Sequence, residues 1–195
     1  MRRVLFFVAL LVALSNSVWA AKYQGKDVSA QKVGGLINML DQDGQRRSLA
    51  DFRDKVVVIY FGYTRCPDVC PTTLSTMASV MKLLGPSAKQ TQLLWVTIDP
   101  ERDTQLLLKN YVLAFNPDFI ALRGTKEETD AMADAFKIGY QLLPYKGSIL
   151  VDHSAFGYII DRQGRTRLKI PYGMAPEQIA SDIRAFLPKR PPNGN

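Results

Sequence analysis

The sequence predicts an α/β fold in which a central mixed β-sheet is flanked by helices. Residues 55–62 (KVVVIYFG) and 91–98 (TQLLWVTI) are continuous apolar runs rich in β-branched and aromatic residues, a pattern typical of strands that are buried on both faces. Residues 71–84 and 104–115, which follow these runs, carry apolar residues at helical spacing. This βαβα alternation predicts parallel strands at the centre of the sheet.

Local signals define the elements that surround this centre. Residues 35–40 lead into Asp41-Gln-Asp-Gly44 and predict a short strand and a tight turn, because Asp-Gly tolerates the positive φ that such turns need. Ser48-Leu-Ala-Asp51 matches a capping box and predicts one short helical turn. Gly85-Pro86 ends the first long helix.

The C-terminal half predicts further short strands and two helices. The capping box Thr125-Lys-Glu-Glu128 opens a helix that runs to about Lys137, and Asp161-Arg-Gln-Gly164 is the turn of a terminal hairpin. Apolar residues at helical spacing predict a last amphipathic helix around Ile179 and Ile183. The expected topology is that of a thioredoxin-like domain. The expected strands are residues 120–122, 149–152, 158–161 and 167–170.

The first 20 residues have the layout of an export signal. Arg2 and Arg3 precede an unbroken apolar run at residues 4–14, and small residues near Ala20 offer a cleavage site. An uncleaved anchor is the alternative, in which residues 4–21 would associate with the membrane. We therefore expect an exported domain, in the periplasm or on the outer face of the cytoplasmic membrane.

The expected domain layout has four parts. Residues 1–20 are the signal peptide, 21–34 a polar linker, 35–187 the folded domain, and 188–195 (PKRPPNGN) a flexible tail. The formal net charge is +7, but the Lys and Arg residues are scattered and no basic run is interleaved with aromatic residues. A solvated surface is therefore favoured, and no nucleic acid partner is expected.

Cys66 and Cys70 are the only cysteines, and they lie in Thr64-Arg-Cys-Pro-Asp-Val-Cys-Pro71, between the first buried strand and the first long helix. We expect Pro71 at the first helical position and Cys70 near the N-cap, where the positive end of the helix stabilises a thiolate. A structural disulfide is the alternative in an oxidising compartment. A bridge that closes so small a loop contributes little stability, so the sequence favours a reactive pair.

His153 is the only histidine and lies between two expected strands. Two sulfur ligands and one imidazole suit a soft cation such as Cu(I), whereas structural zinc generally takes four protein ligands. An Asp side chain would supply that fourth ligand, so zinc is disfavoured but not excluded. Asp152 either orients the imidazole or is simply solvated, and Asp99 ends a strand at the edge of the sheet that carries the cysteines.

Other polar and sulfur-containing residues have simpler interpretations. Asp103 precedes a helix and is expected to be its N-cap. Met77, Met81 and Met132 recur at helical spacing and are expected to fill the core. Met174 lies in a predicted loop, and its participation in the site stays open.

Three separated motifs together resemble the Sco/SenC family, whose members are exported thioredoxin-like factors that serve copper-centre assembly in cytochrome c oxidase. The matching segments are residues 60–71 (YFGYTRCPDVCP), 97–104 (TIDPERDT) and 151–154 (VDHS), with 158–161 after them. The resemblance implies that Cys66, Cys70 and His153 are copper ligands and that the two cysteines form a redox-active dithiol.

The leading functional hypothesis is a copper metallochaperone that passes its metal to a partner protein. The expected partners are the copper-binding subunit of cytochrome c oxidase or another copper protein, together with a thiol reductant. The alternative is a thiol-disulfide oxidoreductase in which Cys66 and Cys70 are catalytic and reduce the copper-site cysteines of a partner. Copper sensing and protection from oxidants also stay open, and whether the protein is an enzyme is undecided at this stage.

Overall fold

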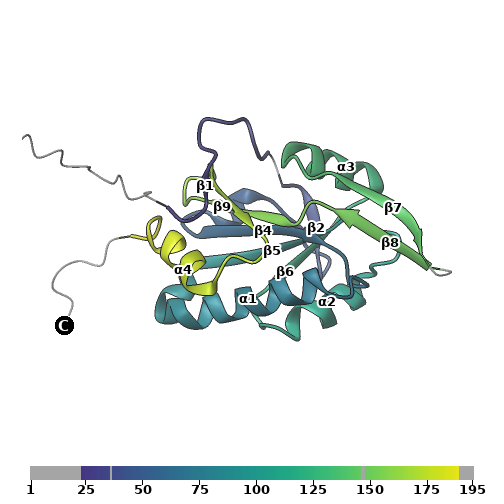
Figure 1. The fold of residues 1–195 in the computed structure, drawn as a ribbon, viewed down its shortest axis with the longest axis horizontal. Helices are drawn as coiled ribbons and strands as arrows, with labels where there is room; N and C mark the ends of the chain where they lie inside the picture. Colours follow the sequence, from purple (N-terminus) through teal and green to yellow (C-terminus); the bar gives the residue numbers. More distant parts are fainter. Residues whose placement is uncertain (1–22, 36, 146–147, 189–195) are drawn as a thin grey trace, which may run out of the picture.

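The computed structural model describes residues 23–35, 37–145 and 148–188. An eight-stranded mixed sheet lies at its centre, in the order β1-β10-β9-β4-β5-β6-β2-β3, and a separate two-stranded sheet pairs β7 with β8 (Figure 1). The strands are β1 (Lys26–Asp27), β2 (Met39–Asp41), β3 (Arg46–Arg47), β4 (Val56–Gly62), β5 (Thr91–Thr97), β6 (Ile120–Arg123), β7 (Tyr140–Tyr145), β8 (Ser148–His153), β9 (Phe156–Ile160) and β10 (Thr166–Pro171).

The expected α/β fold with a central mixed sheet is confirmed. Strand β4 pairs in parallel with β5 and antiparallel with β9, and β5 pairs in parallel with β6. Every residue of β4 and β5 is buried, as their apolar sequences predict. The two parallel connections pass through helices, so the ends of β4 and β5 open onto the same edge of the sheet.

Helices cover both faces of the large sheet. In Figure 1, α1, α2 and α4 lie below the sheet, and α3 lies above it beside the β7–β8 hairpin. The two capping boxes predicted from the sequence are present, at Ser48 and at Thr125. The helical segments are the 3₁₀ turns η1 (Leu49–Phe52) and η2 (Gly85–Gln90) and the helices α1 (Val69–Leu84), α2 (Gln105–Leu113), α3 (Lys126–Ala135) and α4 (Pro176–Arg184).

Part of the segment expected as a linker belongs to the folded domain. Strand β1 pairs with the edge strand β10, Val28 is buried, and the backbone N–H of Gly25 donates to Asp182 at 2.7 Å. The expectation was wrong for these residues because the edge strand supplies partners that a polar segment can use. The expected signal peptide and the tail at 189–195 lie outside the described residues.

Strand β7 is a second departure from the sequence prediction. Residues 140–145 were not among the strands expected from the sequence; their polar and apolar residues do not alternate, and Pro144 lacks the N–H of a ladder residue. In the structure Leu142 and Leu143 are exposed. Pairing with β8, from Tyr140 opposite His153 to Tyr145 opposite Ser148, creates the strand. The result is a hairpin that extends past the end of the main sheet (Figure 1).

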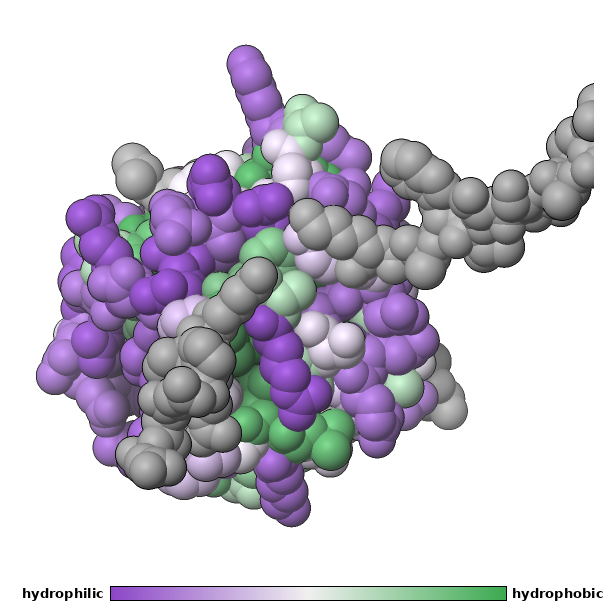
Figure 2. Space-filling model, turned by 90° about the vertical axis from the view of Figure 1, so that its left-hand side faces the viewer, coloured by the Kyte–Doolittle hydropathy of each residue, from purple (hydrophilic) through white to green (hydrophobic). Residues whose placement is uncertain are grey.

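The surface shown in Figure 2 is mostly hydrophilic, with hydrophobic residues gathered in a narrow strip near its centre. This distribution agrees with the solvated surface expected from the scattered charges. Across the described part of the chain, no helix has both the length and the hydropathy that a membrane span needs.

Candidate metal centre

The two cysteines lie at the connection between β4 and α1, with Cys66 in the loop and Cys70 in the first turn of the helix. The chain leaves the sheet after Gly62, turns, and enters the helix at Val69. A Cβ atom at Gly62 would lie 2.2 Å from the Trp95 ring and 2.8 Å from Cys70 Sγ. Only glycine leaves space here, because real Cβ atoms do not approach heavy atoms this closely. The glycine therefore lets the Cys70 sulfur lie directly against the end of the central strand.

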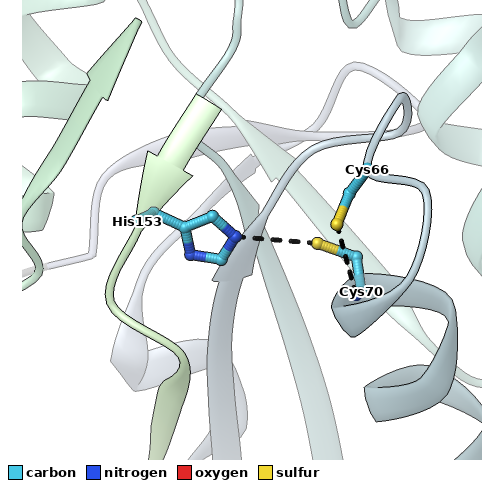
Figure 3. A group of neighbouring side chains, drawn as sticks. All are labelled: Cys66, Cys70 and His153. Atoms are coloured by element: carbon cyan, nitrogen blue, oxygen red, sulfur yellow. Dashed lines mark hydrogen bonds between the residues drawn. The ribbon is translucent and has the colours of Figure 1, made fainter. Parts of the chain in front are cut away.

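The helix begins earlier than the sequence predicts. Asp68 is the N-cap, so Cys70 and Pro71 are the second and third helical residues rather than the N-cap and the first. The amide N–H of Cys70 is one of the first-turn donors that have no partner within a helix. It donates to Cys66 Sγ at 3.4 Å (Figure 3). The predicted stabilisation of a thiolate by the helix N-terminus thus acts on Cys66 through this bond.

His153 is the last residue of β8, and its ring points at the cysteines (Figure 3). Its Nε2 atom lies 3.8 Å from Cys70 Sγ, and its Nδ1 atom lies 3.1 Å from the carbonyl oxygen of Ser154. A carbonyl only accepts hydrogen bonds, so Nδ1 carries the proton in the neutral ring. Nε2 then has a free lone pair, which is the form that binds a metal ion.

Together the three side chains form a compact donor set. The two Sγ atoms and a ring nitrogen all lie within 4.8 Å of one another, and both cysteines are free thiols. Three ligand atoms bound at about 2.0–2.3 Å from one ion lie about 3.5–4 Å apart when they surround it evenly. The 3.8 Å between Cys70 Sγ and His153 Nε2 already matches that separation, and the 4.8 Å limit on all three atoms leaves a shift of about 1 Å at most. Among the described residues this is the one such cluster of three His, Cys, Asp or Glu side chains.

The two thiols have opposite acidities. The hydrogen bond from the Cys70 side chain, helped by the backbone N–H groups of Asp68 and Cys70, lowers the pKa of Cys66 to about 4. The pKa of Cys70 is raised, because its proton is shared with Cys66 and because it is buried. The metal-free pair therefore holds one thiolate and one thiol near neutral pH, and metal binding releases the remaining proton.

Asp103 has a different role from the one expected. Thr104, not Asp103, caps α2, and its side chain accepts a hydrogen bond from the N–H of Leu107. Asp103 is fully buried and accepts hydrogen bonds from Thr64 and from the Thr97 hydroxyl at 2.6 Å. The local sequence allows either residue as a cap, and these contacts with Thr64 and Thr97 determine the outcome. Asp103 therefore ties the start of the cysteine loop to the end of β5.

The remaining carboxylates lie outside the donor set. Asp99 pairs with Arg102 at 2.6 Å, so its charge is already compensated. Asp152 accepts a hydrogen bond from Gln141 and does not orient the imidazole. The acceptor at His153 Nδ1 is the carbonyl oxygen of Ser154. No fourth ligand from a described Asp or Glu joins the three donors.

An apolar cavity of about 110 Å³ lies beside Cys70 and His153. Met174, which the sequence left open, lines this cavity with Phe156 and Tyr172. The core methionines expected from the helical spacing are buried, namely Met77, Met81 and Met132. The cavity places apolar side chains on one side of the site. No sequence signal indicated it, since its lining comes from segments far apart in the chain, namely β4, α1, β5, the end of β8, the start of β9, the β10–α4 loop and α4.

Comparison with known proteins identifies relatives of this arrangement. The family model described as SCO1/SenC matches residues 25–188. A SCO2-like protein of Rickettsia felis is 33% identical over 156 residues, which cover 78% of this chain and 76% of the relative. The bovine mitochondrial protein called SCO2 homolog is 31% identical over 202 residues, covering 96% of this chain and 76% of that protein.

Solved structures share the fold and the thioredoxin-like topology expected from the sequence. ScoI of Bradyrhizobium japonicum, solved with copper bound, has a TM-score of 0.74 and 33% identity, covering 80% of this chain and 99% of that chain. Yeast Sco1, also solved with copper bound, has a TM-score of 0.71 and 29% identity, covering 79% of this chain and 87% of that chain. The family match over most of the chain, the identity to its relatives and the shared fold all agree, and the protein belongs to the SCO1/SenC family.

Proposed function

We propose that this protein is a copper metallochaperone that binds copper through Cys66, Cys70 and His153 and assists assembly of the copper centre of cytochrome c oxidase. The observation that carries the proposal is the grouping of two Sγ atoms and one imidazole nitrogen within 4.8 Å. Two soft sulfur donors and an imidazole match Cu(I), which tolerates three ligands. The related proteins ScoI of Bradyrhizobium japonicum and yeast Sco1, both solved with copper bound, support copper as the cargo.

The proposed partner is the copper-binding subunit of the oxidase or another copper protein, with a thiol reductant that keeps the cysteine pair reduced. Cys66 is partly exposed while Cys70 is buried, so an incoming ligand meets Cys66 first. Stepwise ligand exchange then starts at the exposed thiolate and ends at the buried sulfur. The apolar segment at residues 4–14 supports an exported location, in the periplasm or on the outer face of the cytoplasmic membrane.

The second candidate is a thiol-disulfide reductase that acts on the copper-site cysteines of a partner. Its supporting observation is the lowered pKa of Cys66, because a thiolate near neutral pH is the nucleophile of disulfide exchange. That chemistry needs only Cys66 and Cys70. It gives no reason for an imidazole with a free lone pair 3.8 Å from Cys70 Sγ.

The substitution His153→Ala separates the two candidates, because it removes the imidazole and keeps the dithiol. If copper delivery is the function, the variant binds Cu(I) more weakly by at least the roughly 10–100-fold that loss of an outer-shell partner of a metal ligand costs, and it fails to support oxidase assembly at limiting copper. Affinity is measured against a Cu(I) chelator, and oxidase activity in a host whose own gene is deleted. The matched control is Asp152→Ala, which alters the exposed neighbouring side chain. A folded His153→Ala protein that restores full oxidase activity at limiting copper would overturn the proposal.

A further inference from the structure

The hairpin that carries His153 is not part of the main sheet. Strand β8 pairs only with β7, and the chain reaches the main sheet again at Phe156, where β9 begins. Backbone groups on the edge of β8 that faces away from β7 therefore have no strand partner. The position of His153 relative to the cysteines depends on what holds that outer edge.

Tyr63 holds one point on the outer edge of β8. Its hydroxyl oxygen accepts a hydrogen bond from the backbone N–H of Val151 at 3.3 Å. The side chain is almost fully buried, and its ring meets the His153 ring edge-on with a centroid separation of 6.1 Å. On the other side, the carbonyl of Tyr63 accepts the N–H of Cys66 at 3.3 Å. One residue thus contacts both halves of the donor set.

Arg102 holds a second point on the same edge. Its Nη1 atom donates to the carbonyl of Ile149 at 2.8 Å, while the Asp99 carboxylate fixes the rest of the guanidinium group. Ile149 and Val151 are two residues apart, so their backbone groups point to the same side of the strand.

We propose that Tyr63 and Arg102 are positioning residues that clasp the outer edge of β8 and set the distance between His153 and the cysteine pair. We call the contacts of Tyr63 and Arg102 with β8 the clasp. These contacts exist in the metal-free protein, so the inference rests on the proposed function only for its predicted effect on copper affinity. The two side chains come from the end of β4 and from the β5–α2 connection, the same two places that support the cysteine loop. A shift of the hairpin therefore moves His153 relative to sulfurs that stay fixed.

The test is Tyr63→Phe, which removes the hydroxyl and keeps the ring. In the reduced, metal-free protein we expect the amide of Val151 to exchange its hydrogen about tenfold faster, since it loses its partner. The nuclear Overhauser effect between the aromatic ring at position 63 and the imidazole ring of His153 should weaken. With Cu(I) bound, affinity should fall about tenfold, and X-ray absorption should show less imidazole scattering around copper.

Tyr158→Phe is the matched control. Tyr158 is also a buried tyrosine, and its hydroxyl donates one hydrogen bond, to the carbonyl of Phe136 at 2.8 Å. The control variant loses a comparable bond without touching β8, so general destabilisation affects both variants alike. Faster exchange at Val151 together with reduced imidazole ligation in Tyr63→Phe alone supports the clasp.

Two results overturn it. One is unchanged Val151 exchange and an unchanged ring contact in Tyr63→Phe. The other is faster exchange with copper affinity and imidazole scattering equal to those of Tyr158→Phe. If the natural protein binds no Cu(I), the proposed function fails, and the two metal-free measurements alone decide the clasp. Should Tyr63→Phe not fold, Arg102→Lys removes the other contact, with Arg162→Lys as control because Arg162 likewise contacts one backbone carbonyl and one carboxylate, both of Asp54 and neither near β8. The same measurements and the same two overturning results then apply, with Val151 exchange replaced by that of Leu150 and its neighbours.

Discussion

The two cysteine sulfurs are chemically unequal although they lie in one short loop. Cys66 accepts hydrogen bonds from the Cys70 thiol and from helix-terminal N–H groups, which lower its pKa to about 4. Cys70 is buried, and its pKa is raised. The imbalance prepares one sulfur to meet a metal ion or an electrophile at neutral pH, while the other keeps its proton until the ion arrives.

The first prediction follows from this imbalance. In the reduced, metal-free protein at pH 6, iodoacetamide should modify Cys66 and spare Cys70, as read by mass spectrometry of the peptides. The pKa of Cys66 is about 4 in the folded protein and about 8.5 in the unfolded chain. The Cys66 thiolate therefore contributes fully to the free energy of unfolding above about pH 8.5, and this contribution declines as the pH falls towards 4. In Cys70→Ala, which removes the donor to the Cys66 sulfur, the alkylation of Cys66 at pH 6 should slow. Equal modification of both cysteines in the natural protein would contradict the assignment.

Gly62 is a second residue on which the site depends, because its surroundings leave no space for a larger side chain. The change Gly62→Ala would place a Cβ 2.2 Å from the Trp95 ring and 2.8 Å from Cys70 Sγ. We expect a loss of about 1–3 kcal/mol in the free energy of unfolding, with weaker metal binding, because the ring and the sulfur must both move. Urea denaturation and Cu(I) titration measure the two effects. Gly35→Ala is the control, since its Cβ would make only an ordinary 3.4 Å contact with Ala135.

At the level of elements, the β9–β10 hairpin is stabilised at its turn by one buried carboxylate. Asp161 accepts hydrogen bonds from the backbone N–H groups of Gln163 and Arg165 and from the side chains of Arg165 and Arg167. The turn also needs Gly164, whose φ is +80°. The hairpin fixes β9 beside β4, yet the turn lies at the end of β4 opposite the cysteines.

The third prediction is that Asp161→Asn lowers the free energy of unfolding by about 1–3 kcal/mol, because the amide leaves charged donors without their partner. Copper affinity should stay unchanged, since the turn lies at the far end of the sheet. Asp54→Asn serves as control, as Asp54 is 79% exposed and its ion pair with Arg162 is long at 3.4 Å. A fall in copper affinity with Asp161→Asn would show that the two ends of the sheet are coupled.

At the scale of the whole molecule, the sequence was sufficient for most local patterns, although it placed the N-caps of α1 and α2 two residues and one residue away from Asp68 and Thr104, where the structure has them. The buried runs of β4 and β5, the capping boxes at Ser48 and Thr125 and the hairpin turn at Asp161 all formed as expected. Each depends on residues within one element or one turn. The three candidate ligands, which the structure brings together, were also proposed from residue type, because two cysteines and a lone histidine leave few alternatives for a soft metal.

Features that depend on distant partners were not predictable. Strand β1 exists only because it pairs with β10, and β7 only because it pairs with β8. The positions 70 and 153 are 83 residues apart, so nothing local sets the 3.8 Å between Cys70 Sγ and His153 Nε2. The contacts of Tyr63 and Arg102 with β8 belong to the same class, since each joins side chain to backbone across more than 40 residues.

The last prediction concerns the whole fold, because the donor set draws on both sheets. An ion held by Cys66, Cys70 and His153 would link the loop after β4 to the β7–β8 hairpin, and unfolding would then require its release. Free Cu(I) held by a chelator buffer at about 100 times the dissociation constant should stabilise the protein by about 2.7 kcal/mol. For a domain of this size that raises the Tm by about 5–10 °C, as measured by calorimetry under anaerobic conditions. His153→Ala should show a smaller rise at the same free Cu(I), and Asp152→Ala an unchanged one. An equal rise in His153→Ala would mean that the cysteines alone hold the ion and that the hairpin contributes no ligand.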